Sequence, residues 1–572
     1  MFLKCPIILI FLTEISSYTV EVKVKPGKLR GIREETVTDG RHYYAFYGVP
    51  YAQSPVGKLR FKDPKPPKKW KTTFDATVEY HGACAQSHLV HKHALFGYED
   101  CLSLNVYSAH IPKEKDEKLQ PVAVWIHGYG FAASLSHIFG GDSFLDKNIV
   151  FVTVTHRIGV FGFLKSNISS PGGNMGLKDI VMALKWIRKN IKHFGGDKRR
   201  ITVMGNDSGA SFLSLLLMTK YRNMFAKMIL QSGTIFAPSM YKRNANLERD
   251  RFLRNLQNVG YRDISTAPTK DIILASQKIY TSKEIINFQR PVVPFSPTID
   301  ISLNESFLSL SPDEFYNNAK NFNVSKSILL GFNNAESISE IIPFLHNTRY
   351  LNYFSPIFKY MIPYSDGCIY NYTTKIYTKI ANKIKHYYFK EGISEKSFVN
   401  FLRYTTDLRK YPIWKFIQKL ISLKTSKIFV YKFSYVGGLN TVKATSLAGT
   451  NIKVKGASNG DEICYILRCE PLTDKYIKTN NDTTIQDRKF MTKITEMWAN
   501  FIRRGDPTLF SQSGNIVWPA MTLKEKNILK LGKDTKLINS KLEDETFSFW
   551  EDIYTMYYAN YSNCAQNIHE EL

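Results

Sequence analysis

The chain has 572 residues, of which 44% are hydrophobic and 13% aromatic, and its formal net charge is +27. This composition excludes a disordered or fibrous chain and indicates a globular protein with a large core. The sequence has no zinc-ligand spacing, no phosphate-binding P-loop and no nucleic-acid-binding module, so we expect no metal, no cofactor and no nucleic-acid partner. The positive charge fits either an acidic partner or a solvated lysine-rich surface.

The first 17 residues are predicted to be a secretory signal peptide. Lys4 precedes the apolar run 6–12, and the serines at 16–17 are small residues near a plausible cleavage point. The alternative, a buried first strand, fits the position and shortness of this run less well. Because no later apolar stretch reaches the roughly 20 residues of a membrane span, we expect residues 18–572 to have no transmembrane anchor.

Short apolar segments in the first half of the chain predict the strands of a sheet. They lie at 28–32, 45–50, 102–107, 122–126, 149–154 and 201–204. Apolar residues at helical spacing predict helices at 176–187 and 210–217. This alternation predicts an α/β fold with a largely parallel sheet covered by helices. Since no repeat or long linker interrupts the chain, we predict one domain over 18–572 with a short tail from about 556.

Between the last of these strands and its helix, Gly205-Asn206-Asp207-Ser208-Gly209 has the glycine spacing of a nucleophile elbow. Such an elbow is a strained turn that exposes its central residue at the top of a sheet. Asp207 occupies the position of the reactive serine, and Ser208 lies one position too far to replace it. We expect the N–H groups at the start of the following helix to hold the carboxylate of Asp207.

Longer motifs resemble the carboxylesterase type-B family, the cholinesterase-like α/β hydrolases, from about Gly31 to Trp550. The matching segments are 48–52, 59–61, 99–107, 125–131, 157–163, 190–197, 231–233 and 498–501. The resemblance implies an α/β-hydrolase fold with a large central, mixed, mostly parallel sheet flanked by helices. It also implies a serine-type carboxylic ester hydrolase, if the catalytic residues are present.

The resemblance assigns the three positions of a catalytic triad. Asp207 stands at the nucleophile, Glu336 matches the acid, and Asn459 stands where the family has its histidine base. Asparagine cannot accept and return a proton near neutral pH. Loss of the nucleophile or the base costs comparable triads about a millionfold in turnover. We therefore expect a degenerate triad without catalytic activity.

The oxyanion hole is also altered. By resemblance its donors are the backbone N–H groups of Tyr129, Gly130 and Ser208. Tyr129 replaces a glycine, and its side chain is expected to fill space that the acyl group needs. Loss of one donor costs about 3 kcal/mol of transition-state stabilisation.

Six cysteines remain after removal of the signal peptide. The resemblance implies a disulfide between Cys84 and Cys101, worth about 3 kcal/mol of stability in the chain-entropy account. In cholinesterases this loop carries a tryptophan that binds quaternary ammonium, and here it has none, which disfavours choline esters. The pairing of the other four stays open: Cys368, Cys464, Cys469 and Cys564.

Six N-x-S/T sequons suit a glycoprotein of the secretory pathway. They begin at Asn167, Asn304, Asn323, Asn371, Asn481 and Asn560. Asn206 also heads a sequon, but a glycan inside the elbow would block folding. The chain ends in His569-Glu570-Glu571-Leu572, which is similar to the tails that retain proteins in the endoplasmic reticulum. We expect a lumenal protein, with secretion as the alternative.

Three functions stay open. The first is a non-catalytic carboxylesterase-like protein that binds a protein or ligand; neuroligins, neurotactin and gliotactin look like precedents, although they are membrane-anchored. The second is a non-hydrolysing binder of small apolar esters or lipids. The third is an ester hydrolase with residual or unconventional activity, in which Asp207 acts as the nucleophile. That third route needs a base-activated water, which Asn459 cannot supply.

Overall fold

The structure is a computed structural model. It describes residues 18–79, 82–87, 95–114, 118–128, 138–165, 173–237, 240–281, 284, 294–300, 306–318, 325–358, 375–390, 392–423, 426–477, 482–508 and 516–558. Several predicted features lie outside these residues. They are the signal peptide, Tyr129, Gly130, the six sequon asparagines, Cys368, Cys564 and the chain end from 559.

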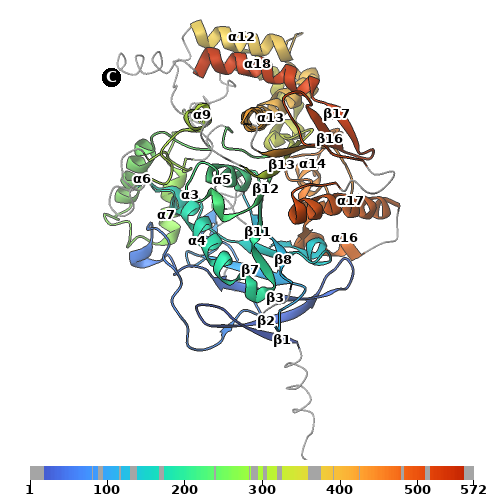
Figure 1. The fold of residues 1–572 in the computed structure, drawn as a ribbon. Helices are drawn as coiled ribbons and strands as arrows, with labels where there is room; N and C mark the ends of the chain where they lie inside the picture. Colours follow the sequence, from blue (N-terminus) through green and yellow to red (C-terminus); the bar gives the residue numbers. More distant parts are fainter. Residues whose placement is uncertain are drawn as a thin grey trace, which may run out of the picture.

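A mixed sheet runs through the centre of the molecule, and within the described ranges it has 13 strands (Figure 1). Across the sheet the order is β1 (Thr19–Lys23), β2 (Lys28–Glu35), β3 (His42–Pro50), β7 (Ser103–Ser108), β10 (Val150–Val154), β8 (Gln120–Ile126), β11 (Gly196–Asn206), β12 (Lys227–Gln231), β13 (Ser327–Asn333), β14 (Lys427–Phe433), β16 (Asn527–Leu531) and β17 (Lys536–Asn539). The short β4 (Phe74–Asp75) pairs with β2.

The strands from β10 to β16 in this order run parallel, and the outer strands at both edges pair antiparallel. This arrangement confirms the predicted α/β fold with a mixed, mostly parallel sheet. The parallel strands are apolar on both faces because both faces are covered. In β11, Val203 belongs to the core on one face and Met204 to the core on the other.

Helices cover the two faces of the sheet (Figure 1). Side chains of α4 (Met175–Asn190), α5 (Ser208–Leu216) and α13 (Phe398–Ser422) belong to one core, and those of α15 (Ile463–Ile466) and α17 (Asp482–Arg504) to the other. The remaining helices are α2 (Asp142–Leu145), α3 (Gly159–Phe163), α6 (Asn246–Asn258), α7 (Thr269–Gln277), α9 (Pro312–Asn317), α10 (Ile342–His346), α11 (Phe354–Ile357), α12 (Lys375–Tyr388), α14 (Thr441–Leu447), α16 (Thr473–Ile477) and α18 (Lys541–Tyr558).

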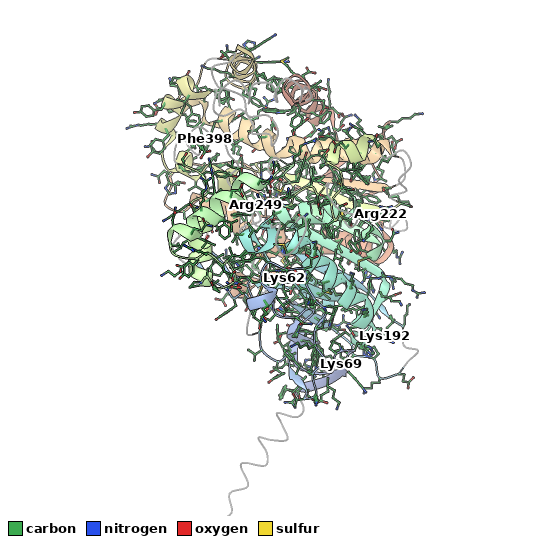
Figure 2. The ribbon with its side chains drawn as sticks, turned by 90° about the vertical axis from the view of Figure 1, so that its left-hand side faces the viewer. Lys62, Lys69, Lys192, Arg222, Arg249 and Phe398 are labelled. Carbon is green, nitrogen blue, oxygen red and sulfur yellow. A yellow bond between two sulfur atoms is a disulfide. The ribbon has the colours of Figure 1, made fainter. Side chains whose placement is uncertain are left out.

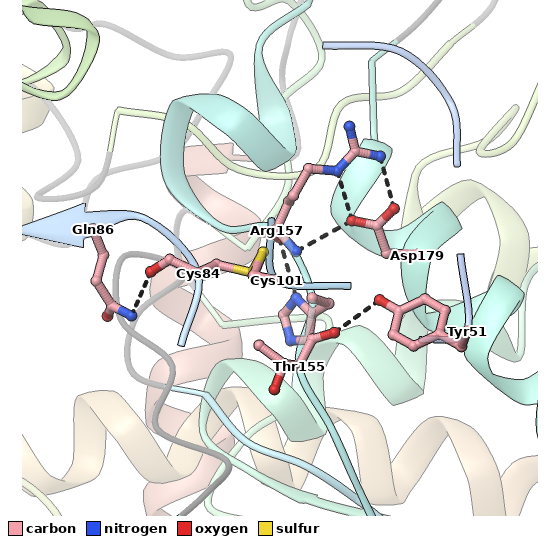
Figure 3. The surroundings of a disulfide bond; sticks show 8 residues. Tyr51, Cys84, Gln86, Cys101, Thr155, Arg157 and Asp179 are labelled. Atoms are coloured by element: carbon pink, nitrogen blue, oxygen red, sulfur yellow. Dashed lines mark hydrogen bonds and ion pairs between the residues drawn. A yellow bond between two sulfur atoms is a disulfide. The ribbon is translucent and has the colours of Figure 1, made fainter. Parts of the chain in front are cut away.

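The predicted Cys84–Cys101 disulfide is present, with 5.0 Å between the Cα atoms (Figure 3). Beside it, Arg157 donates to both oxygens of Asp179, at 2.8 Å and 2.7 Å. Both side chains are buried, and Tyr51 donates to the backbone nearby. The arginine of the 157–163 motif therefore has a structural role, because it neutralises a buried carboxylate.

A second disulfide joins Cys464 and Cys469, with 5.4 Å between the Cα atoms. It ties α15 to the short strand β15 (Arg468–Cys469), which pairs with β9 (Phe139–Gly140). The sequence left this pairing open. The bridge lies shortly after the segment that carries Asn459, so it anchors the chain that follows the candidate site.

Candidate functional site

A tight turn joins β11 to α5, at the carboxyl end of the parallel strands. Asp207 lies at its tip with φ +50° and ψ −120°, a backbone conformation that side-chain-bearing residues rarely adopt. A Cβ atom at Gly205 would lie 2.7 Å from the carbonyl oxygen of Ile126, and one at Gly209 only 2.2 Å from the same atom. The two glycines thus let the turn pass directly against the end of β8.

The carboxylate of Asp207 forms an ion pair with a distant arginine. Its Oδ1 atom accepts from Nη2 of Arg409, on α13, at 2.9 Å. Arg409 also pairs through Nε with Glu340 at 2.8 Å. Burial disfavours the charged guanidinium, but Glu340 and Asp207 outweigh it and hold the pKa of Arg409 above its ordinary value. The carboxylate of the elbow residue is therefore charge-paired.

One expectation about Asp207 is wrong. Its side chain makes no capping bond to the N-terminus of α5. The physical reason is the competing guanidinium, since a full positive charge attracts a carboxylate more strongly than the partial charge of a helix end.

Asn459 lies beside Asp207 and links two residues of the elbow. Its Nδ2 atom lies 3.5 Å from Oδ1 of Asp207, at the limit for a hydrogen bond, and its Oδ1 atom accepts from Asn206 at 3.1 Å. Asn206 is buried and also donates to the backbone of Gln231. The amide of Asn459 thus acts as a polar spacer between Asn206 and Asp207, a role that involves no proton transfer.

Glu336 is fully buried. Its Oε1 atom accepts from Oγ of Ser232 at 2.7 Å and from the backbone N–H of Asn333 at 2.6 Å. Its Oε2 atom has no hydrogen-bond partner among the residues that the structure describes. Burial, and next the charge of Glu462, raise the pKa of Glu336 to about 8. The carboxyl group is therefore mostly protonated at neutral pH.

Glu462 is the second buried carboxyl group of this region. It accepts from Nδ2 of Asn333 at 2.7 Å, from the hydroxyl of Tyr431 at 3.2 Å and from Nε2 of Gln231 at 3.3 Å. Burial raises the pKa of Glu462 as well. With more hydrogen-bond donors than Glu336, it is the better placed of the two to carry a negative charge.

Glu336→Gln is expected to remove a pH-dependent loss of stability. The pKa of Glu336 is raised from 4.5 to about 8 in the folded protein, so the stability that its proton confers is full below 4.5 and is lost as pH rises through 8. In thermal melts from about pH 5 to pH 8, the melting temperature of the wild type should fall relative to that of Glu336→Gln. The exposed Glu525 provides the matched control, Glu525→Gln. If the difference in melting temperature between the wild type and Glu336→Gln stays constant over this pH range, the raised pKa of Glu336 is contradicted.

Ser208 is the described member of the three predicted oxyanion-hole positions. It is fully buried, and a Cβ atom at Gly128 would lie 2.3 Å from its Oγ atom. Its side chain thus lies against the 127–128 segment. This close approach explains why position 128 is a glycine.

The structure brings Asp207, Asn459 and Ser208 together at one end of the sheet, and the backbone N–H of Asn459 donates to the carbonyl oxygen of Glu336 at 3.2 Å. The sequence patterns did not identify Arg409 and Glu340 as residues of this site. Arg409 lies 202 positions from Asp207 in a long helix with several other basic residues, and no motif distinguishes it. Among the described residues, no group of three or more histidine, cysteine or carboxylate side chains is arranged to hold a metal ion, and no described helix is long and apolar enough to cross a membrane.

Comparison with known proteins identifies the family. The model of the carboxylesterase family matches residues 17–550. Esterase E4 of Myzus persicae is 30% identical over 519 residues, which are 87% of this chain and 88% of that protein. Cholinesterase of Mus musculus is 29% identical, over 92% of this chain and 86% of that protein.

A solved structure shows the same fold. It is the crystal structure of juvenile hormone esterase from Manduca sexta with OTFP covalently attached. The two structures match with a TM-score of 0.75 and 23% sequence identity, and the match covers 94% of this chain and 100% of the esterase chain. The match over nearly the whole chain and the shared architecture lead to one conclusion. The protein belongs to the carboxylesterase family and has the α/β-hydrolase fold of that family.

Proposed function

We propose that this protein is a catalytically inactive carboxylesterase that acts as a binding or interaction protein in the secretory pathway. The observation that carries the proposal is the ion pair between Asp207 and Arg409 at the nucleophile position. A carboxylate whose oxygen is held by a guanidinium at 2.9 Å is a poor nucleophile, because attack would break that pair.

The neighbouring groups support the same proposal. Acyl transfer needs a base that takes a proton from the nucleophile or from water, and the amide of Asn459 has no such capacity. Glu336 has no imidazole to orient; its Oε1 atom is bonded to Ser232 and the backbone of Asn333 instead. The contacts made by Asp207, Asn459 and Glu336 thus support a structural role for all three positions.

The proposal includes a cellular location and a second candidate function. Lumenal retention rests on the signal-like segment 1–17 and the tail His569-Glu570-Glu571-Leu572. Binding of a small apolar ester without hydrolysis is the second candidate function, and the juvenile hormone esterases among the relatives favour it. The charged pair of Asp207 and Arg409 would then lie near the ester group of such a ligand.

A fluorophosphonate probe tests whether position 207 holds an activated nucleophile. We expect the wild type to gain no adduct mass under conditions that fully label an active carboxylesterase run in parallel, because neither a base nor an unpaired nucleophile is present. Asp207→Asn is the matched control, since it keeps the size of the side chain and removes its charge. An adduct that peptide mass spectrometry maps to Asp207, and that Asp207→Asn lacks, overturns the proposal.

A further inference from the structure

A pocket of about 720 Å³ lies beside the outer strands of the sheet, and we call it the outer pocket. Most of its residues come from the end of β3, the segment 52–70, β4 and the start of β7. Its walls are largely apolar and include Tyr47, Val56, Leu59, Trp70, Phe74 and Leu102. Small-molecule sites in proteins are concave, measure about 300–1,000 Å³ and combine apolar walls with a few polar groups. The outer pocket therefore has the size and the lining of a ligand site.

The outer pocket is separate from the elbow. Ser103, at the start of β7, pairs with Pro50, at the end of β3, and the strands β10 and β8 lie between β7 and the strand β11 that leads to the elbow. Figure 2 shows Lys69, which precedes Trp70 of the pocket wall, in the lower part of the molecule, and Phe398, the first residue of α13, in its upper part. A ligand in the outer pocket is thus independent of the catalytic state of the elbow.

Two aromatic rings of the outer pocket are held in place by their polar atoms. The hydroxyl of Tyr47 donates to the carboxylate of Glu34 at 2.9 Å, and Nε1 of Trp70 donates to the backbone oxygen of Lys28 at 2.8 Å. The ring centroids of Trp70 and Phe74 lie 5.7 Å apart. Since these polar atoms are already bonded, the rings offer their carbon surface to a ligand. A wall that is already ordered lowers the entropic cost of binding.

The outer pocket also has two hydroxyl groups whose hydrogen bonds are not made. Ser54 and Ser103 both line it, and the Oγ atom of each is buried without a partner among the described residues. Leaving a buried hydroxyl unpaired is costly, and the cost is relieved when a ligand supplies the partner. Rotation of a serine side chain to another staggered rotamer is enough to redirect its hydroxyl. The two serines thus favour a ligand that carries an oxygen atom.

The lining of the outer pocket has no net charge. Its charged members are Lys68 and Asp100, and both are exposed, so their charged groups stay in water. A ligand ion inside the pocket would lose its hydration and gain no counter-charge from the apolar walls. The lining therefore favours a neutral ligand over an ion, in spite of the chain's net charge of +27.

We propose that the outer pocket binds a neutral, largely apolar small molecule with one oxygen group, of which a medium-chain alcohol is the simplest example. The apolar body would lie against Trp70, Phe74 and Leu102. The oxygen would form a hydrogen bond with Ser54 or Ser103. The proposal concerns a second site and stands whether or not the elbow has lost its catalysis.

Displacement of 1,6-diphenylhexatriene, a hydrocarbon fluorophore that emits in apolar surroundings, tests the outer pocket. Its emission should rise on binding to the wild type, and 1-decanol should reverse the rise. Val78→Asp places a carboxylate on the pocket wall and should weaken the binding of both molecules at least about 10-fold. Val259→Asp is the matched control and should bind like the wild type. The two valines are similarly exposed, at 53% and 59%, but Val259 does not line the pocket.

Two further comparisons test the class of ligand. Decanoate has the chain length of 1-decanol and a negative charge, so about 10-fold more of it should be needed to displace the fluorophore. The double variant Ser54→Ala/Ser103→Ala should bind 1-decanol about fivefold more weakly than the wild type. It should bind the fluorophore as tightly as the wild type, because a hydrocarbon makes no hydrogen bond.

Three results overturn the proposal. The first is a wild type that binds no fluorophore, and the second is equal binding by the wild type, Val78→Asp and Val259→Asp, which places the fluorophore elsewhere on the molecule. The third is decanoate that displaces as well as 1-decanol, or a serine double variant that binds 1-decanol unchanged, since either contradicts the class of ligand. Far-ultraviolet circular dichroism checks that the variants are folded. Val56→Asp, at another exposed position of the wall, takes the place of Val78→Asp if that variant does not fold.

Discussion

Gly209→Ala is expected to destabilise the protein by more than about 4 kcal/mol, or to prevent its accumulation in folded form. The added Cβ atom would lie 2.2 Å from the carbonyl oxygen of Ile126 and 3.1 Å from the carbonyl carbon of His127. Both atoms belong to the backbone at the end of β8, in the middle of the sheet, so they cannot move aside as a flexible side chain would. Urea denaturation followed by far-ultraviolet circular dichroism measures the loss.

Asp207→Ala is the matched control in the same turn. The Asp207→Ala substitution leaves Arg409 paired with Glu340, so we expect a loss of about 1–3 kcal/mol, smaller than that of Gly209→Ala. If Gly209→Ala unfolds at the same urea concentration as Asp207→Ala, the close approach of the turn to β8 does not require a glycine at position 209. The expected contrast would show that the two glycines, rather than the side chain of Asp207, maintain the form of the elbow.

The second large effect is a gain of activity. The double variant Asp207→Ser/Asn459→His should hydrolyse p-nitrophenyl acetate at least about 100-fold faster than the wild type, because a triad acts as a unit and returns only when both residues return. Glu336 provides the acid, since its Oε2 atom has no partner within the described part of the chain and a neighbouring imidazolium favours its ionised form. A histidine at 459 would supply that partner.

The two single variants show whether one substitution alone increases the rate of hydrolysis. Neither Asp207→Ser nor Asn459→His alone should exceed the wild type by more than about threefold, since each leaves the unit incomplete. Adding Tyr129→Gly to the double variant tests the predicted oxyanion-hole position, and a further increase is expected if the tyrosine side chain fills the space of the acyl group. A double variant that is folded but no faster than either single variant contradicts the assignment of these positions.

Much of the fold was accessible from local sequence patterns. The apolar segment 201–204 is the centre of β11, and the helical spacing over 176–187 marks α4, which extends over Met175–Asn190. These predictions succeed because buried parallel strands and amphipathic helices each have a characteristic spacing of apolar residues. The strand at 102–107 was also found, as β7, but its antiparallel pairing on both sides depends on distant partners and has no local signature.

The candidate site was accessible only in part. The family motifs locate Asp207, Glu336 and Asn459, but they do not reveal the ion pair with Arg409, which joins residues 202 positions apart. The expectation that the helix N-terminus holds Asp207 was wrong for that reason. The Cys464–Cys469 bridge was likewise unassigned, because cysteine spacing allows several pairings and only the three-dimensional structure chooses among them.

The central claim, that the elbow has lost its catalysis, is tested most directly by the hydrolysis of p-nitrophenyl acetate by the wild type beside Asp207→Ala. We predict equal rates for the two proteins, both at the level of heat-inactivated protein, since Asp207 is held by Arg409 and Asn459 supplies no base. A wild-type rate that clearly exceeds background and that Asp207→Ala abolishes contradicts the claim and makes this protein an esterase with an aspartate nucleophile.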